Sequence, residues 1–221
     1  MALRFWKRLM GAALASAAGL FLFMSGAAAQ ERGSLADMTL GADDAPVRLI
    51  EYASLTCNHC AAFHAEAFPR LKSDYIETGK VHFTLRELPV VPAHPALVAR
   101  SYAGTMLARC IADEDGAEGY FSAMKTLFEA QKIWAFGEDA RGELLKIAND
   151  AGLDEAGFDA CIAREDLITH IDKNVAIATD EFAVRATPGF IINGDYRRYD
   201  SFEALFDALD AAVEKASGGA G

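Results

Sequence analysis

The chain has 221 residues, of which 52% are apolar and 24% are charged, with 18 glycines and 6 prolines. This composition excludes a collagen-like chain, a low-complexity disordered chain and a polytopic membrane protein. The 32 acidic and 21 basic residues give a formal charge of −11, so no broad positive field exists that could hold nucleic acid or an anionic membrane surface. The length suffices for one or two domains that bury a core without cross-links, so the four cysteines need another explanation.

The first 29 residues are typical of a secretory signal peptide. A basic start, with Arg4, Lys7 and Arg8, precedes an uncharged stretch over residues 9–29 that ends in three alanines. The alternative is an uncleaved anchor helix, because a stretch of this length could span a bilayer. We expect cleavage and export to a compartment where disulfides persist. The mature chain would then carry 18 basic and 32 acidic residues.

The next part of the chain predicts a βαβ unit. Residues 30–46 are polar and rich in small side chains, which indicates an arm that enters a domain. An apolar run over residues 47–52 predicts a strand. Residues 61–75 have helical spacing, and Pro69 should kink this helix. Alternating apolar and polar residues at 81–86 predict a half-buried strand, which a right-handed crossover should place beside the first.

The remainder predicts a helical region followed by a ββα unit. From residue 95 to about 184 the spacing of apolar residues is wholly helical. Strand character returns at residues 190–192, an Asn-Gly pair at 193–194 predicts a tight hairpin turn, and residues 196–199 predict the returning strand. A last amphipathic helix follows from residue 202 to 213.

The sequence Cys57-Asn58-His59-Cys60 follows the first predicted strand and opens the first predicted helix. The unpaired N–H groups and the dipole of a helix start stabilise an anion, so Cys57 is predicted to be a nucleophilic thiolate of low pKa. A protonated His59 would lower the pKa of Cys57 further. A stable thiolate is also a good leaving group, which makes the Cys57–Cys60 disulfide oxidising. Cys60, one turn inside the helix, is predicted to be the resolving thiol.

Two other interpretations of this motif stay open. The first is a structural disulfide, although a two-residue loop at a helix start is a reactive arrangement. The second is half of a zinc site with His64 as a third ligand, although a structural site needs a fourth ligand and no second Cys-x-x-Cys pair follows. We expect no metal and no cofactor beyond the redox-active cysteine pair.

Three runs of residues together resemble the DsbA-like periplasmic thiol-disulfide oxidoreductases. They are Gly41-Ala42-Asp43-Asp44-Ala45-Pro46-Val47, Glu51-Tyr52-Ala53-Ser54-Leu55-Thr56-Cys57-Asn58-His59-Cys60 and Ala186-Thr187-Pro188-Gly189-Phe190-Ile191-Ile192-Asn193-Gly194. The resemblance covers nearly the whole mature chain. It implies an α/β thioredoxin fold, formed by residues 47–93 and 185–217, with an inserted all-helical domain at residues 94–184.

The resemblance also implies roles for single residues. Glu51, six positions before the first active-site cysteine, would be a buried carboxylate that helps move a proton as Cys60 attacks. Thr187-Pro188 would form a cis-proline loop that faces the sulfur, where an extended substrate peptide could pair as an added strand. Many family members have proline after the first cysteine where this chain has Asn58, so the resemblance does not carry over a reduction potential.

Cys110 and Cys161 lie on separate predicted helices of the insertion. In an oxidising compartment we expect them to bond to each other. The bond would close a loop of about 50 residues and contribute about 4 kcal/mol on the chain-entropy model. The alternative is two buried free thiols that pack as small hydrophobic side chains.

Together these observations predict a monomeric periplasmic enzyme that introduces disulfide bonds into reduced or unfolded exported proteins. The resemblance implies a membrane quinone-linked partner that reoxidises it. One alternative is a disulfide isomerase or reductase of the same fold. From a different class, a zinc-binding or chaperone-like module without turnover stays open.

Overall fold

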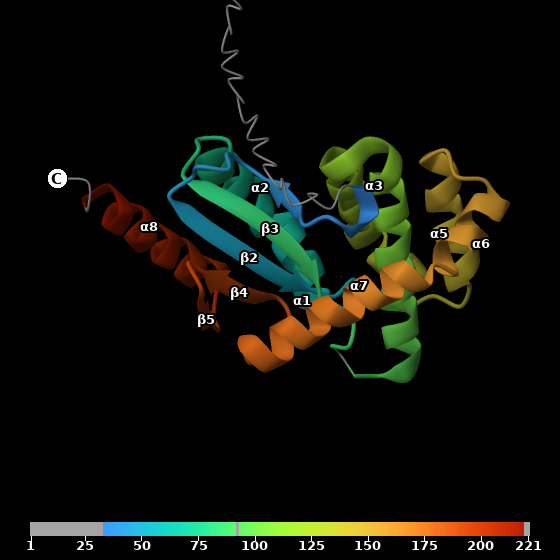
Figure 1. The fold of residues 1–221 in the computed structure, drawn as a ribbon. Coiled ribbons are helices and arrows are strands. Elements are labelled where there is room, and N and C mark those ends of the chain that lie inside the picture. Colours follow the sequence, from blue (N-terminus) through green and yellow to red (C-terminus); the bar gives the residue numbers. More distant parts are fainter. Residues whose placement is uncertain (1–32, 92, 219–221) are drawn as a thin grey trace, which may run out of the picture. The chain divides into compact units, whose positions relative to one another are not determined.

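The computed structural model describes residues 33–91 and 93–218, and the predicted signal peptide at residues 1–29 lies outside them. Within this part of the chain the core is a five-stranded sheet in the order β1-β3-β2-β4-β5 (Figure 1). Strands β2 and β3 run parallel, and the other neighbouring pairs run antiparallel. The strands are β1 (Met38–Leu40), β2 (Val47–Ala53), β3 (Val81–Glu87), β4 (Gly189–Ile192) and β5 (Asp195–Arg197).

Helices cover both faces of this sheet. One face packs against the helical segment that follows β2 and against α8 (Phe202–Gly218), which places Leu205 and Leu209 in the same core as β2. The opposite face is covered by α7 (Glu165–Ala176) and the π-turn η4 (Ile177–Glu181). The central strand β2 is therefore covered on both sides, and its carboxyl end leads to the segment where the Cys-x-x-Cys motif begins.

The helical segment after β2 begins at Asn58, within the Cys-x-x-Cys motif that was predicted to open it, and contains a π-turn before Pro69. It runs as α1 (Asn58–Ala62), η2 (Phe63–Ala67), α2 (Phe68–Leu71) and η3 (Lys72–Ile76). Proline lacks a backbone N–H and cannot continue the regular ladder. The Phe68 N–H bonds to the Phe63 carbonyl instead, which closes the wider turn of a π-helix. The predicted kink thus takes the form of a π-turn.

The prediction of a half-buried strand at residues 81–86 was wrong, because β3 is buried on both faces. Its polar residues His82 and Thr84 are each only 7% exposed. The reason is the tertiary environment: α7 packs on one face of β3, and β1 pairs with its edge. β1 comes from residues 30–46, which the sequence predicted only as an arm.

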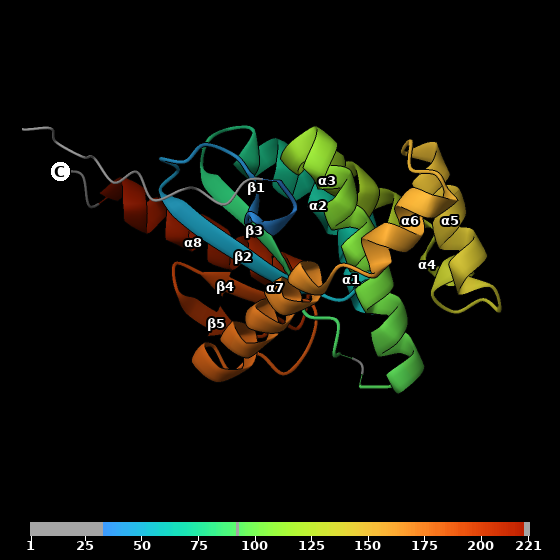
Figure 2. The same ribbon diagram turned by 45° about the vertical axis from the view of Figure 1, so that its right-hand side comes forward.

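The insertion starts with α3 (Pro95–Glu129), which Gly116 divides into two arms. At Gly116 the backbone has φ 62° and ψ −148°, a conformation that favours glycine. Three shorter helices follow before α7, and two of them lie on the side of α3 that faces away from the sheet (Figures 1 and 2). They are α4 (Gln131–Trp134), α5 (Ala140–Asp150) and α6 (Glu155–Ile162), of which α5 and α6 are the outer pair. In the part of the chain that is described, no helix combines the length and the apolar character needed to cross a membrane.

A buried ion pair ties the insertion to the sheet. Arg109 of α3 is fully buried, and its Nε and Nη2 atoms donate to the two carboxylate oxygens of Glu87 at 2.7 and 2.8 Å. The Tyr120 hydroxyl donates to the same carboxylate at 2.6 Å, and Arg109 Nη1 donates to the Ser34 carbonyl at 2.6 Å. These bonds link β3, both arms of α3 and the segment before β1 around one pair of charges.

The hairpin between β4 and β5 has the two-residue turn that the sequence predicted. Ile192 faces Asp195 across the turn. The turn residues Asn193 and Gly194 have φ values of 50° and 91°, as a type I′ turn requires at both positions. The returning strand begins one residue earlier than predicted.

Candidate active site

Cys57 lies at the start of α1, where the strand geometry of the chain changes to helix. Its φ and ψ of −95° and 117° are extended, and the Ala61 N–H makes a helical bond to its carbonyl. Its side chain is only 8% exposed. The Cys57 thiol donates to the Thr187 carbonyl oxygen at 3.3 Å. The first cysteine of the motif therefore faces the loop that precedes β4.

The surroundings of Cys57 favour its thiolate form. Several contributions together lower the pKa of Cys57 to about 6, although burial acts in the opposite direction, and the largest of them is a hydrogen bond from the Cys60 thiol. The backbone N–H groups of Cys60 and His59 also stabilise the thiolate and contribute to this lowering. Cys57 is therefore largely ionised at neutral pH when the pair is reduced.

Cys60 has the opposite environment. It is fully buried, and burial raises its pKa well above the ordinary value of a thiol. The neighbouring Cys57 sulfur and the charge of Glu51 raise it further. Two cysteines three residues apart thus differ in protonation state at neutral pH, which is how a site separates a nucleophile from a proton-bearing partner.

Thr187 and Pro188 form one wall of a pocket beside Cys57. The peptide bond between them is cis. The pocket has a volume of about 500 Å³ and is lined by Thr187, Pro188, His59 and residues of the loop between β5 and α8, among them Tyr199. The His59 side chain is exposed and lies at the pocket wall. That its imidazole tunes Cys57 stays a prediction.

Glu51 is fully buried in the middle of β2, on the face of the sheet that packs against α1. Its Oε2 atom lies 3.0 Å from Nε2 of His64, and its Oε1 atom has no hydrogen-bond partner among the described residues. His64 therefore contacts a carboxylate, and it does not join the two cysteines in a metal site. No group of three or more His, Cys, Asp or Glu residues in the described part of the chain could hold a metal ion.

Comparisons with known proteins place this geometry in a family. The thioredoxin family model matches residues 34–211. The chain belongs to the thioredoxin family. The crystal structure of alpha-DsbA1 from Wolbachia pipientis superimposes on it with a TM-score of 0.68 at 29% identity, over 81% of this chain and 92% of that one. BdbD from Bacillus subtilis, at 19% identity, has the same fold with a TM-score of 0.68 over 80% of this chain and 93% of that one.

A curated relative points in the same direction. A Rickettsia bellii protein, whose name places it provisionally among the protein-disulfide oxidoreductases, is 27% identical over 179 residues, or 81% of this chain. The present chain matches only 65% of the length of that relative. The resemblance to DsbA-like proteins and the predicted thioredoxin fold with a helical insertion are confirmed.

Sequence reasoning missed Gln131, which braces the active-site segment of this thioredoxin-family protein. Its Nε2 atom donates to the carbonyl oxygens of Leu55 and Cys57 at 2.9 and 3.0 Å, and the side chain is buried. Gln131 begins α4 in the insertion, more than 70 positions from its partners. Nothing in the local sequence signals such a bond, because it depends on how the insertion packs.

Cys110 and Cys161 are joined by a disulfide in the structure, with the Sγ atoms 2.15 Å and the Cα atoms 6.1 Å apart. The bond links the first arm of α3 to α6. Both cysteines are buried in a small cluster with Met106, Leu167 and Ile171. This cluster is separate from the core around Cys57 and Cys60.

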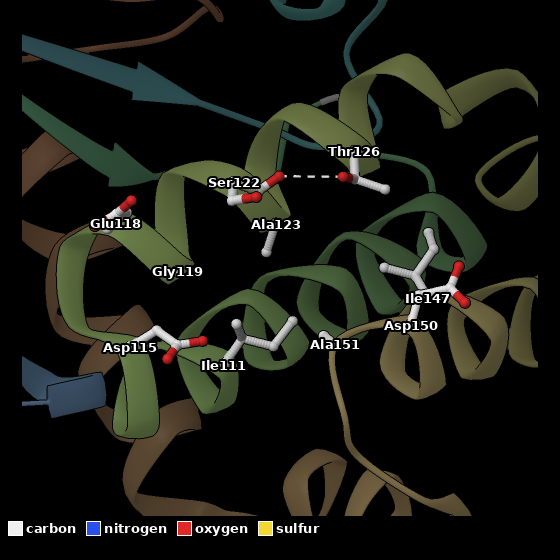
Figure 3. Close-up of a pocket in the computed structure, with 10 residues that line it drawn as sticks. All are labelled: Ile111, Asp115, Glu118, Gly119, Ser122, Ala123, Thr126, Ile147, Asp150 and Ala151. Carbon is white, nitrogen blue, oxygen red and sulfur yellow. Dashed lines mark hydrogen bonds between the residues drawn. The ribbon is translucent and has the colours of Figure 1, made fainter.

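A second pocket, of about 530 Å³, lies within the insertion of the thioredoxin-family fold (Figure 3). The two arms of α3 and the end of α5 line it, with Asp115, Glu118 and Asp150 among its side chains. None of the predicted site residues reaches it. It contains no sulfur or imidazole group and is not part of the cysteine site.

Proposed function

We propose that this chain is a thiol-disulfide oxidoreductase that introduces disulfide bonds into proteins by exchange through Cys57 and Cys60. The opposed environments of the two thiols carry this proposal. Cys57, with a pKa of about 6, is a stable thiolate and hence a good leaving group. Stabilisation of the reduced form in this way makes the disulfide form oxidising.

The reaction begins with the Cys57–Cys60 disulfide. A substrate thiolate attacks Cys57 Sγ, the bond to Cys60 breaks, and Cys60 takes up a proton. A second substrate thiolate then attacks the substrate sulfur of the mixed disulfide, and Cys57 leaves as a thiolate. The two substrate sulfurs lose two electrons, and the two enzyme sulfurs gain them. Attack falls on Cys57 because it is 8% exposed and contacts Thr187, which lines the pocket, whereas Cys60 is fully buried.

The substrates in this proposal are reduced or unfolded exported proteins. The pocket beside Thr187 and Pro188 supports a peptide substrate, because an extended chain could lie against this wall next to Cys57. The signal-like sequence at residues 1–29 supports export to the periplasm. Each turnover leaves the cysteine pair reduced, so a partner that accepts two electrons is needed, and a membrane quinone-linked protein fits that need.

The direction of exchange is tested with two substrates. Oxidised enzyme is given in stoichiometric amount to a reduced multi-cysteine protein, and reduced enzyme is given to a scrambled one. We expect fast oxidation of the first and slow rescue of the second, together with a reduction potential well above that of the glutathione couple. Faster rescue of the scrambled protein, or a potential near about −270 mV as in thioredoxin, would assign the chain to isomerases or reductases. Stoichiometric bound zinc without thiol exchange would assign it to a metal-binding module.

A further inference from the structure

The Glu51 carboxylate is placed in an environment that is costly for a charge. It projects from β2 into the core that also holds Leu49 and Ala53, and it is fully buried. Its only hydrogen-bond partner among the described residues is His64, and one carboxylate oxygen has none. Burial of a carboxyl group with so few hydrogen-bond partners lowers the stability of the fold. Such a group is therefore a candidate for a functional role.

The His64 ring is held in one orientation by three aromatic side chains. It stacks on Phe128 with centroids 4.3 Å apart and an interplanar angle of 19°, and it contacts Phe68 at 4.9 Å and the edge of Phe63 at 5.4 Å. This packing fixes Nε2 toward the Glu51 carboxylate at 3.0 Å. The ring therefore cannot turn away from its partner without disturbing contacts with α2 and α3.

The second ring nitrogen of His64, Nδ1, is the candidate contact with solvent. No hydrogen bond to Nδ1 is found among the described residues, and the His64 side chain keeps 8% exposure where Glu51 keeps none. An imidazole exchanges protons at either nitrogen. His64 thus connects a fully buried carboxylate to the edge of the solvent.

We propose that His64 is a positioning residue that passes protons between solvent and Glu51 each time Cys60 changes its protonation state. This inference rests on the proposed function and adds a route for the proton. When Cys60 leaves as a thiolate, solvent gives a proton to Nδ1, Nε2 gives its proton to the Glu51 carboxylate, and the carboxyl group gives a proton to Cys60 Sγ. Reoxidation reverses every transfer, so the proton and the imidazole tautomer are both restored after one cycle.

The charged and titratable groups around this route are few. Glu51 of β2 acts on Cys60 of α1 through its charge. The charge of Glu51 also acts on Tyr120 of α3. The Tyr120 hydroxyl donates its hydrogen bond to Glu87, so it does not bond to Glu51. The side chains of α2 and α3 in contact with the His64 ring are phenylalanines, which carry no proton. Of the groups that Glu51 bonds to or acts upon, His64 is the one that retains exposure.

The test compares His64→Gln with a matched His82→Gln control. Glutamine keeps a hydrogen-bond donor for Glu51 but cannot relay a proton. His82 is also a buried histidine, on β3, where it bonds to the Ala42 carbonyl. Single-turnover reduction of the Cys57–Cys60 disulfide by a dithiol is followed across the pH range, in water and in deuterium oxide. We expect His64→Gln to slow the step by roughly 100-fold, as loss of a positioned proton-transfer group does, and to flatten its pH profile.

Combination with Glu51→Gln separates a shared route from two independent effects. If His64 acts through Glu51, the double variant is no slower than Glu51→Gln alone. A His64→Gln enzyme with the rate and pH profile of wild type, or additive losses in the double variant, would overturn the inference. Loss of dithiol oxidation by the wild-type enzyme would instead refute the proposed function.

A measurement on the wild-type protein covers the case in which His64→Gln does not fold. Nitrogen NMR of the imidazole rings reports the tautomer of His64 in the oxidised and reduced forms. We expect His64 to change its protonation state or tautomer with pH, and Glu51→Gln to alter that change. A single neutral tautomer at all pH values in both redox forms would mean that no proton passes through His64.

Discussion

Two cysteines separated by only two residues occupy opposite environments in this protein. Cys57 takes hydrogen bonds at a helix start, whereas Cys60 lies one turn deeper and is fully buried. The sequence predicts Cys57 as the nucleophile and Cys60 as the resolving thiol, because a strand followed by Cys-x-x-Cys and a helical pattern indicates which sulfur meets the free N–H groups. The contribution of the Thr187 loop was not predictable from spacing alone, since this loop lies 130 positions away.

The pKa of Cys57 predicts how the reduced protein reacts with alkylating agents. A thiolate reacts and a thiol does not, so the rate of labelling should rise as the pH passes about 6 and level off above it. Mass mapping should place the label on Cys57, because burial raises the pKa of Cys60 well above the ordinary value. First labelling at Cys60, or a midpoint near that of a free cysteine, would contradict the assignment.

At the scale of elements, the local sequence pattern predicts the β4–β5 hairpin and the helices. It does not predict which faces of a strand are buried. Asn193-Gly194 specifies its turn through the backbone of two residues. In contrast, β1 is three residues long and lies in a polar segment, and it exists because β3 offers an edge. His82 and Thr84 look solvent-facing in the sequence, but each is only 7% exposed, because β1 pairs with the edge of β3 and α7 packs against this strand.

The link between β3 and α3 should depend on the buried pair of Glu87 and Arg109. Glu87→Gln leaves the fully buried Arg109 without its counter-charge, and we expect a loss of about 3–5 kcal/mol in the free energy of unfolding. Urea denaturation measures this loss. Burial opposes ionisation of Glu87, but the charge of Arg109 prevails and lowers its pKa. The stabilisation is therefore present above the ordinary glutamate range and is lost as the pH falls below it.

The matched control is an exposed ion pair in the same insertion. Arg141 contacts Glu155 at 3.0 Å, and both side chains are at least half exposed. Solvent screens such pairs, so Glu155→Gln should leave the urea midpoint unchanged. Equal losses in Glu87→Gln and Glu155→Gln would show that burial of the Glu87 pair adds no stability.

At the scale of the whole molecule, the disulfide between Cys110 and Cys161 closes a long loop within the insertion. The two cysteines are 51 positions apart. Replacing both by alanine should lower the free energy of unfolding by about 4 kcal/mol on the chain-entropy model. Thermal unfolding of the double variant measures this effect, with reduced wild-type protein as the comparison. An unchanged Tm would mean that the loop is already constrained without the bond.

The order of the strands also affects how the site comes into existence during synthesis. Cys57 is made early, but the Thr187 carbonyl that it contacts is made 130 residues later, and β2 cannot pair with β4 until then. At ordinary rates of translation this delay is on the order of 10 s. During that interval Cys57 cannot make its contact with the Thr187 carbonyl. The same topology that builds the site from two distant parts of the chain therefore delays its assembly until most of the chain has been synthesised.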